Sequence, residues 1–356
     1  MLDYIVVGLG LSGIAISRNL EKRNRQFVVF EDSSQKSSLV AGGLFNPVIL
    51  KRFTLAWNAN EHMKVAIPFY KELEAKLQAK IVYPIDIYRK FFSAEEQNNW
   101  FEAADKPLLS EYLDTDLVKE INACIPSEYS FGRVRQTGVI DTDVLISEYR
   151  NYLKNEDKIK FERFNYNELQ ISEDSVSYKG ISARKIIFCE GFGMQHNPFF
   201  NYLPLRGNKG EYLTIYSEEL QLEEAVKSSV FIIPLGNNLY KVGATYNNQD
   251  KDPQPSEEAR EELENKLAKL INCKFEIVDQ SAGIRPTSKD RKPMLGRHPE
   301  YKNLYCCNGF GSRGVLISPS VSEQLIELAE NDVQLPSEID LQRFSKLTRS
   351  EHPKHS

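Results

Sequence analysis

Arg285 is the residue whose chemistry the sequence constrains most sharply. It stands between Ile284 and Pro286 within AGIRPTSKDRKPMLGRHP, residues 282–299. A guanidinium offers a planar fork of donors that meets a carboxylate with two parallel hydrogen bonds. The adjacent proline limits backbone freedom, so the fork is partly held in place before any ligand binds. An arginine in an ordinary exposed turn is the alternative, and the segment by itself leaves both interpretations open.

A second set of residues has the spacing of a phosphate-binding turn. Gly8, Gly10 and Gly13 follow the apolar run at 4–7 in G-x-G-x-x-G spacing. Gly8 would allow the tight turn, Gly10 the approach of a pyrophosphate, and Gly13 the close packing of helix on strand. The helix N-terminus would add unpaired N–H groups. Glu31, at the end of the next strand, can accept from both ribose hydroxyls, which favours FAD or NAD over NADP. A glycine turn without a ligand is the alternative.

Hydrophobic patterning predicts the elements that position these residues. Residues 4–7 and 26–32 read as buried strands flanking a helix, which is a βαβ opening. Further along, the pattern predicts a helix over 58–80 and a strand near a sheet edge over 80–92. Residues 138–155 read as a strand followed by a helix, with Asp141 or Thr142 as the helix cap. A hairpin-like pair comes next, and its second, buried strand ends at Gly191.

The second half of the chain has mostly strand patterns. Residues 205–285 read as strands, with a hairpin turn at Gly236-Asn237-Asn238 and one polar helix at about 256–271. Residues 303–331 read as a strand, a glycine loop and a helix that begins near Ser318–Pro319. The tail from about 350 is predicted to fray.

Composition narrows the class of protein. Of 356 residues, 41% are hydrophobic and 27% charged, which is ordinary for a globular chain with room for two domains. The net charge of −5 argues against general affinity for nucleic acid, although a local basic groove is compatible with it. The N-terminus lacks the positive region of a secretory signal, and no apolar run approaches the ~20 residues of a membrane span.

Five cysteines form no CxxC pair and no metal-ligand spacing with histidine. They are Cys124, Cys189, Cys273, Cys306 and Cys307. Neighbours on a strand point to opposite faces, so adjacent Cys306 and Cys307 are interpreted as small apolar fillers and not as a redox pair. We therefore expect no metal and a reducing, cytoplasmic location.

Two segments resemble one known family. AGGLFNP, residues 41–47, is similar to the flavin-facing loop of the D-amino-acid-oxidase-like FAD oxidoreductases, and residues 283–320 resemble their C-terminal signature. The similarity is greatest to glycine oxidases and covers most of the chain except 80–135. The resemblance implies an α/β (α+β overall) fold. A Rossmann-like FAD-binding domain (1–80, 138–198, 286–346) is interleaved with a substrate domain built on a mixed β-sheet (81–137, 199–285), followed by a tail at 347–356.

The resemblance also implies roles for individual residues. Arg285 matches the arginine that binds the substrate carboxylate, and Arg313 is the second candidate catalytic residue, assisting with that carboxylate or packing outside. The loop text GSRG departs from glycine oxidases and is closer to the FAD domain of the bifunctional enzyme that builds 5-methylaminomethyl-2-thiouridine in tRNA. The residues expected to contact FAD are Gly8, Gly10, Gly13, Glu31, Gly42, Gly43, Leu44, Gly191, Gly309, Gly311 and Gly314. FAD should bind non-covalently, because 283–288 contain no cysteine.

The implied activity is oxidation of the C–N bond of a small amino acid or N-substituted glycine. Hydride would pass to flavin N5, the imine would hydrolyse, and oxygen would yield peroxide. No catalytic base is identified, and Tyr212, Tyr240 and Tyr246 are possible substrate contacts or packing residues. Two alternatives stay open. One is removal of carboxymethyl from carboxymethylaminomethyl uridine in tRNA, and the other is an amine dehydrogenase with a non-oxygen acceptor.

Overall fold

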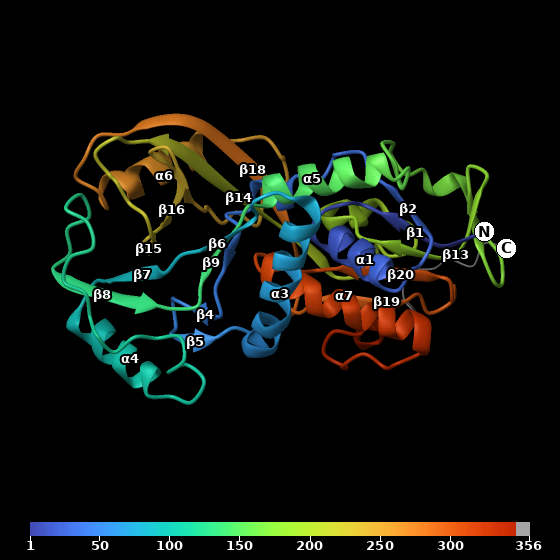
Figure 1. The fold of residues 1–356 in the computed structure, drawn as a ribbon, viewed down its shortest axis with the longest axis horizontal. Helices are drawn as coiled ribbons and strands as arrows, with labels where there is room; N and C mark the ends of the chain where they lie inside the picture. The colour runs from blue at the N-terminus through green and yellow to red at the C-terminus, as the bar shows by residue number, and fades with distance from the viewer. Residues whose placement is uncertain (347–356) are drawn as a thin grey trace.

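A computed structural model describes residues 1–346 and arranges them around two large β-sheets, one in each lobe of Figure 1. The expected mixed α/β class is confirmed. The tail predicted for 347–356 lies outside the described residues. Within 1–346, no helix is long and apolar enough to cross a membrane, and no group of three or more His, Cys, Asp or Glu side chains could hold a metal ion.

The first sheet has eight strands, and its core is parallel. Its order is β10 (Ile159–Lys160), β2 (Phe27–Phe30), β1 (Leu2–Val7), β13 (Ile181–Phe188), β12 (Val176–Tyr178) and β11 (Leu169–Ile171), with β20 (Leu304–Asn308) also paired to β13 and β19 (Met294–Arg297) paired to β20. The pairs among β10, β2, β1, β13 and β20 are parallel. Parallel strands are covered on both faces, which explains why β2 is apolar at every position.

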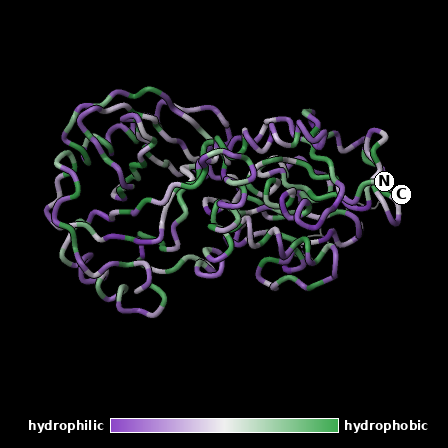
Figure 2. The backbone as a smooth tube through the Cα atoms, in the orientation of Figure 1, coloured by the Kyte–Doolittle hydropathy of each residue, from purple (hydrophilic) through white to green (hydrophobic). Residues whose placement is uncertain are grey.

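Helices cover one face of this sheet. They are α1 (Leu11–Lys22), α3 (Ala59–Leu77), α5 (Thr142–Asn155) and α7 (Gly314–Asn331), and their buried residues share one hydrophobic cluster with alternate strand residues. In Figure 2 hydrophobic segments run through the interior of the lobe where Figure 1 labels β1, β2 and β13. Cys307 belongs to this cluster and Cys306 to the cluster on the opposite face, and both are fully buried. The prediction of two apolar fillers is therefore confirmed.

The second sheet has seven strands and is mostly antiparallel. Its order is β18 (Glu276–Ser288), β14 (Leu205–Tyr216), β17 (Leu239–Gly243), β16 (Phe231–Gly236), β15 (Ala225–Lys227), β7 (Ile87–Phe91) and β8 (Tyr129–Val134). Helix α6 (Glu257–Ala268) packs on one cluster of this lobe and α4 (Ala94–Ala104) on another. The β16–β17 turn has Asn237 and Asn238 at φ 52° and 59°, which confirms the predicted hairpin.

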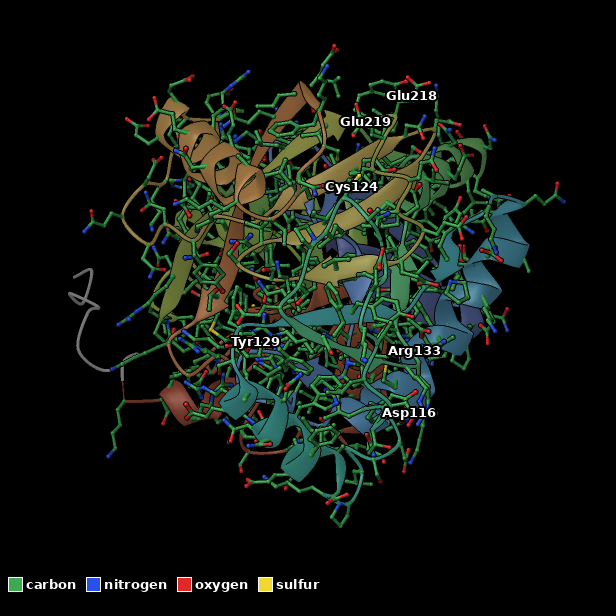
Figure 3. All side chains as sticks on the ribbon, turned by 90° about the vertical axis from the view of Figure 1, so that its left-hand side faces the viewer. Asp116, Cys124, Tyr129, Arg133, Glu218 and Glu219 are labelled. Carbon is green, nitrogen blue, oxygen red and sulfur yellow. The ribbon has the colours of Figure 1, made fainter. Side chains whose placement is uncertain are left out.

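Cys124 lies at the outer end of this lobe, close to Glu218 and Glu219 in Figure 3. Its Sγ donates to the Glu219 carbonyl at 3.4 Å. All five cysteines are free.

Short elements join the two lobes. A three-stranded sheet contains β3 (Leu44–Phe45), β9 (Gly138–Ile140) and β6 (Val82–Pro84), and β4 (Val48–Ile49) pairs with β5 (Thr54–Leu55). Helix α2 (Ser37–Val40) precedes β3. Strand β18 runs unbroken across the expected domain boundary at 285/286. The domain division therefore remains a prediction about folding units.

Two helix starts test the predicted caps. The Asp141 side chain accepts from Val144 N at 3.0 Å, so Asp141, and not Thr142, caps α5. The predicted start of the last helix near Ser318–Pro319 is wrong, because α7 begins at Gly314. A proline inside a helix removes the donor for the carbonyl four residues earlier. That carbonyl, on Val315, instead accepts from the Tyr70 hydroxyl at 2.9 Å, which lets the helix continue through Pro319.

Candidate active site and cofactor cavity

One large cavity lies where the two sheets meet. Its volume is about 1420 Å³, above the 300–1,000 Å³ typical of small-ligand sites and large enough for a dinucleotide together with a substrate. Arg285, Arg313 and all the residues expected to contact FAD line this cavity, except Gly13. The tertiary structure thus brings together residues from positions 8 to 314.

The β1–α1 turn is closely packed around its glycines. A Cβ on Gly8 would stand 2.6 Å from the Cys189 carbonyl oxygen, and Gly8 has φ +93°. A Cβ on Gly13 would stand 2.0 Å from the Gly8 carbonyl oxygen, so Gly13 lies beneath the turn and supports it. No side chain caps α1 at Gly10. Its first amides therefore face the cavity, where they can meet an anion.

Ser38 is a cavity residue that sequence reasoning missed. Its Oγ accepts from Leu11 N at 3.2 Å and lies 2.9 Å from where a Gly10 Cβ would be. A hydroxyl at this place can move aside or bind a phosphate oxygen. The signal for it was the Ser37-Ser38 pair just before the AGG loop.

Glu31 is held at the end of β2 by backbone and side-chain donors. Only 7% exposed, it accepts from Leu9 N at 2.5 Å, Ser33 N at 2.7 Å and Arg150 Nη2 at 3.0 Å. A carboxylate has about four acceptor positions, so it can also take a ribose hydroxyl. Arg150 on α5 was not foreseen, because 119 residues separate it from Glu31.

The AGG loop lies between the sheets. Gly43 has φ +67°, and a Cβ there would stand 2.1 Å from the Ile140 carbonyl oxygen. A Cβ on Gly42 would meet Ile233 Cδ1 at 2.9 Å, from the seven-stranded sheet. Leu44 then begins β3 and pairs with β9. Only a loop without side chains at 42 and 43 fits this gap.

The 309–314 loop forms another wall. Gly311 N donates to the Pro286 carbonyl at 2.8 Å, which ties the loop to β18. Gly309 and Gly311 have φ +83° and +58°. Thr287 Oγ1 lines this wall, is buried and has no hydrogen-bond partner within residues 1–346. Burying a hydroxyl without a hydrogen-bond partner costs free energy, so the Thr287 hydroxyl indicates that a polar group of a ligand binds here.

The 314 end of the loop contacts the start of α1. A Cβ on Gly314 would stand 3.1 Å from Leu11 Cδ1. Gly314 therefore lets the N-termini of α7 and α1 approach each other at the cavity.

Gly191 follows β13 with φ +54°, and its carbonyl accepts from Asn308 Nδ2 at 2.8 Å. The preceding residue, Glu190, also lines the cavity and was not predicted. Burial raises the pKa of Glu190 to about 7, while hydrogen bonds from Asn197 and Tyr166 oppose the shift.

Arg285 does not lie in an exposed turn. It is a half-buried residue of β18, opposite Asn208 of β14. Its Nη1 donates to Asn208 Oδ1 at 2.9 Å and to the Thr245 carbonyl at 3.3 Å. The guanidinium occupies the volume above Gly210, where an added Cβ would stand 1.9 Å from Nη2. The side chain is thus fixed while Nη2 and Nε donate to no protein acceptor among the residues described.

Arg313 is the N-cap residue of α7 and is half-buried in the cavity wall. Burial is the main cause that lowers the pKa of its guanidinium, and Arg291 acts in the same direction. On α3, the buried His62 lies near it. Burial, followed by the positive charge of Arg313, lowers the pKa of His62 to about 4, so the imidazole is neutral near pH 7.

The three candidate tyrosines, Tyr212, Tyr240 and Tyr246, differ in whether they line the cavity. Tyr212 and Tyr246 line the cavity, and the Tyr246 ring lies 5.0 Å from the Arg285 guanidinium carbon. Tyr240 is buried in the hydrophobic cluster of the seven-stranded sheet, where its hydroxyl accepts from Leu222 N at 3.2 Å. Tyr240 is therefore a packing residue.

Charge is unevenly distributed around the cavity. The acidic lining residues Glu31, Asp32, Glu162 and Glu190 all follow strands of the eight-stranded sheet. No acidic residue from 205–316 lines it, within the part of the chain described. The basic lining residues are Lys51, Arg52, Arg150, Arg163, Arg206, Lys227, Lys251, Arg285, Lys289, Arg291 and Arg313.

The fold and cavity define a dinucleotide-binding enzyme with a separate substrate sheet, and comparisons with known proteins specify the family. The model of the DAO family, FAD dependent oxidoreductase, matches residues 3–328. The chain therefore belongs to the DAO family and is an FAD-dependent oxidoreductase.

Individual relatives are distant. Glycine oxidase from Bacillus subtilis is 24% identical, over 92% of this chain and 93% of that protein. The tRNA 5-methylaminomethyl-2-thiouridine biosynthesis bifunctional protein of Legionella pneumophila (strain Philadelphia 1) is 24% identical over 93% of this chain, which spans 54% of that protein. The crystal structure of glycine oxidase from Geobacillus kaustophilus superposes with a TM-score of 0.77, at 20% identity and 99% coverage of both chains.

The cavity fits the FAD that this family uses. Open amides at the start of α1, Glu31 at the end of β2, the glycine-lined gap at 42–43 and the free Thr287 hydroxyl can each meet a different part of the cofactor. Among the described lining residues the cysteine is Cys189, which lies under the β1–α1 turn and not in 283–288. Non-covalent binding agrees with this arrangement.

Proposed function

We propose that this enzyme oxidises the C–N bond of a small amino acid or N-substituted glycine whose carboxylate binds Arg285. The observation that carries the proposal is the guanidinium held above Gly210 by Asn208 and Thr245, with Nη2 and Nε free toward the cavity. Bound FAD supplies the two-electron acceptor. We assign the remaining predicted glycines and Glu31 to cofactor binding.

The protein's contribution is mainly orientation. A carboxylate on the Arg285 fork fixes the substrate at one end, so the carbon–nitrogen bond keeps one direction in the cavity. The Tyr246 ring lies 5.0 Å from the guanidinium carbon and limits the movement of the guanidinium. The amine must be unprotonated to react, and an imine product would hydrolyse in water.

The test is an anaerobic titration of the FAD-loaded enzyme. Glycine, sarcosine, proline and a panel of D-amino acids are added while flavin absorbance near ~450 nm is followed. Bleaching by one of them, together with a loss of ~100-fold or more in kcat/KM for Arg285→Ala, is the expected result. Arg285→Lys keeps the charge without the fork and should recover only part of the rate. Bleaching that is equal in the parent and Arg285→Ala would contradict the proposal.

A second candidate substrate is carboxymethylaminomethyl uridine in tRNA. It is favoured by the GSRG text around Arg313 and by the excess of basic residues in the cavity wall. Because this chain spans about half of its bifunctional relatives, their whole activity is not transferred to it. A salt-dependent shift of tRNA on binding the enzyme would favour this candidate.

The electron acceptor and the surroundings of the enzyme also stay proposals. Peroxide formed in a one-to-one ratio with oxidised amine would identify oxygen as the acceptor, whereas its absence during turnover with an artificial acceptor would favour a dehydrogenase. A cytoplasmic location remains a prediction from the free cysteines.

A further inference from the structure

We propose that Arg313 and Arg291 form a second anion-binding site beside Arg285, which binds a second anionic group of the same substrate. The inference rests on the proposed function and specifies its substrate class. The substrate would be an N-substituted glycine whose substituent on nitrogen carries another negative charge.

Arg313 has the surroundings of a cation that awaits an anion. Its guanidinium is half-buried in the cavity wall and makes no hydrogen bond or ion pair within residues 1–346. Removing a cation from water without a counter-charge costs free energy, and structural arginines in such places are usually paired. Arg313 interacts electrostatically with His62, which is neutral near pH 7, and with the cationic Arg291, and neither compensates the charge.

Arg291 adds a like charge to the same wall. It is exposed, lines the cavity and has φ +60°, a left-handed conformation that is uncommon for arginine. The nearby acids are occupied. Asp290 pairs with Arg343 at 2.9 Å, and Glu338 pairs with Lys292 at 2.8 Å. The guanidinium groups of Arg313 and Arg291 line the same cavity and repel each other, and a bound anion would relieve that repulsion.

Tyr246 interacts with both Arg285 and Arg313. Its ring lies against the Arg285 guanidinium at 5.0 Å, and Tyr246 also interacts electrostatically with Arg313. Arg285, Arg313 and Arg291 therefore line one cavity together with Tyr246. A substrate that bridges them needs two anionic groups with its nitrogen between them.

The start of α1 offers the cofactor phosphates donors other than the two arginines. The first turn of α1 lines the cavity next to Gly10 and Ser38, whose Oγ accepts from Leu11 N at 3.2 Å. Helix N-termini are the usual site for a pyrophosphate. Arg313 and Arg291 instead belong to the acid-free side of the cavity that also holds Arg285.

The test compares probes that differ only in the second charge. N-(2-carboxyethyl)glycine and its amide N-(2-carbamoylethyl)glycine are titrated anaerobically into the FAD-loaded enzyme. Carboxymethylaminomethyl uridine with and without a 5′-phosphate forms a second pair, which distinguishes carboxylate from phosphate. The variants are Arg291→Gln and Arg313→Gln, and the matched control is Arg184→Gln, an exposed arginine on β13 with 64% of its side chain accessible.

We expect the charged member of one pair to be preferred by ~10-fold or more in kcat/KM, because a charge-assisted hydrogen bond is lost in the neutral member. The ratio of kcat/KM for the charged probe to kcat/KM for the neutral probe should fall toward one in Arg291→Gln and in Arg313→Gln. The ratio should be unchanged in Arg184→Gln. The preference should also weaken as salt is raised, since Arg291 is exposed. The FAD dissociation constant should be the same in Arg291→Gln and the parent.

Two results would overturn the second site. The first is a charged-to-neutral ratio of kcat/KM near one for both probe pairs in the parent. The second is a ratio that stays as high in both variants as in the parent. If neither these probes nor the small amino acids reduce the flavin, the proposed function fails, and the site is then tested by binding alone. Glutarate should perturb the flavin spectrum at lower concentration than its monoamide glutaramate in the parent, and equally with it in Arg291→Gln. Equal binding in the parent would reject the site.

Discussion

At the scale of single residues, the site depends on the space left by a missing side chain as much as on charge. Gly210 has no side chain, and the Arg285 guanidinium fills the space that a Cβ would need. Arg285 and Gly210 come from neighbouring strands that the register places almost opposite each other. The sequence motif around Arg285 does not include Gly210, although the guanidinium position depends on both residues.

The Gly210→Ala variant tests this dependence. The new Cβ would stand 1.9–2.1 Å from three guanidinium atoms, so Arg285 must move away from Asn208. We expect KM for the substrate to rise by ~10-fold or more while FAD absorbance stays unchanged. Gly236→Asn is the matched control, because a Cβ there meets nothing within 4 Å and asparagine tolerates positive φ. An unchanged KM in Gly210→Ala would show that the guanidinium position is not critical.

His62 provides a pH-dependent prediction. Its pKa is about 4 in the native state against 6.5 in the unfolded chain, so the unfolded chain binds more protons between these values. The stability contribution is complete above pH 6.5 and is lost as pH falls toward 4, by up to about 3 kcal/mol. In His62→Gln this acid-dependent loss should disappear from urea unfolding curves at pH 7 and 4.5. Parallel pH dependence in variant and parent would contradict it. Glu190, with a raised pKa, acts in the opposite sense in both proteins.

At the scale of elements, α7 shows how a tertiary contact overrides a local signal. Pro319 lacks the amide that would bond the Val315 carbonyl, which is why the sequence favours a helix start at 318–319. The Tyr70 hydroxyl on α3 donates to that carbonyl and removes the penalty. The helix therefore starts one turn earlier, at the cavity wall beside Arg313.

A double-mutant cycle measures this contact. Tyr70→Phe leaves the Val315 carbonyl buried without a partner, and we expect a loss of about 1–3 kcal/mol in the free energy of unfolding. Pro319→Ala restores the missing amide, so adding it to Tyr70→Phe should recover part of that loss. Additive effects of the two substitutions, measured by urea unfolding, would show that Tyr70 does not compensate for Pro319.

At the scale of the whole molecule, the cavity joins the two sheets. Its walls come from the β1–α1 turn and the ends of β2 and β13 on one side, and from β14 and β18 on the other. A ligand that contacts both walls stabilises the folded state of both lobes, because it binds the native arrangement only.

Removal of FAD should therefore lower the melting temperature of the entire chain. At a free FAD concentration ~100 times its dissociation constant, the gain is about 2.7 kcal/mol. Calorimetry with and without FAD should show one shifted transition that includes both lobes. Glu31→Ala should reduce the shift at a fixed FAD concentration, because it removes the predicted ribose acceptor. A shift confined to one of two separate transitions would contradict a cofactor that links the lobes.

Much of the site could be predicted from the sequence, and the misses share one cause. The glycines of the β1–α1 turn, Glu31 and Arg285 were found because their spacing or local context has a direct chemical meaning. Ser38, Arg150 and Glu190 were missed because nothing in their local sequence distinguishes them. Their proximity to the cavity arises from strand order, which brings distant segments together.

The sequence by itself determined the βαβ opening and the alternation of strands and helices, since period-two and period-3.6 patterning and the glycine spacing are local properties of the chain. The FAD-dependent family was indicated by the resemblance of residues 41–47 and 283–320 to the D-amino-acid-oxidase-like oxidoreductases. The sequence also determined that Cys306 and Cys307 face opposite clusters. Only the tertiary structure decided that Arg285 lies above Gly210, that Arg313 and Arg291 stand together without an acid, and that α7 begins at Gly314. Each of these depends on contacts between segments far apart in the chain, and burial and charge pairing at such contacts are set only when the sheets assemble.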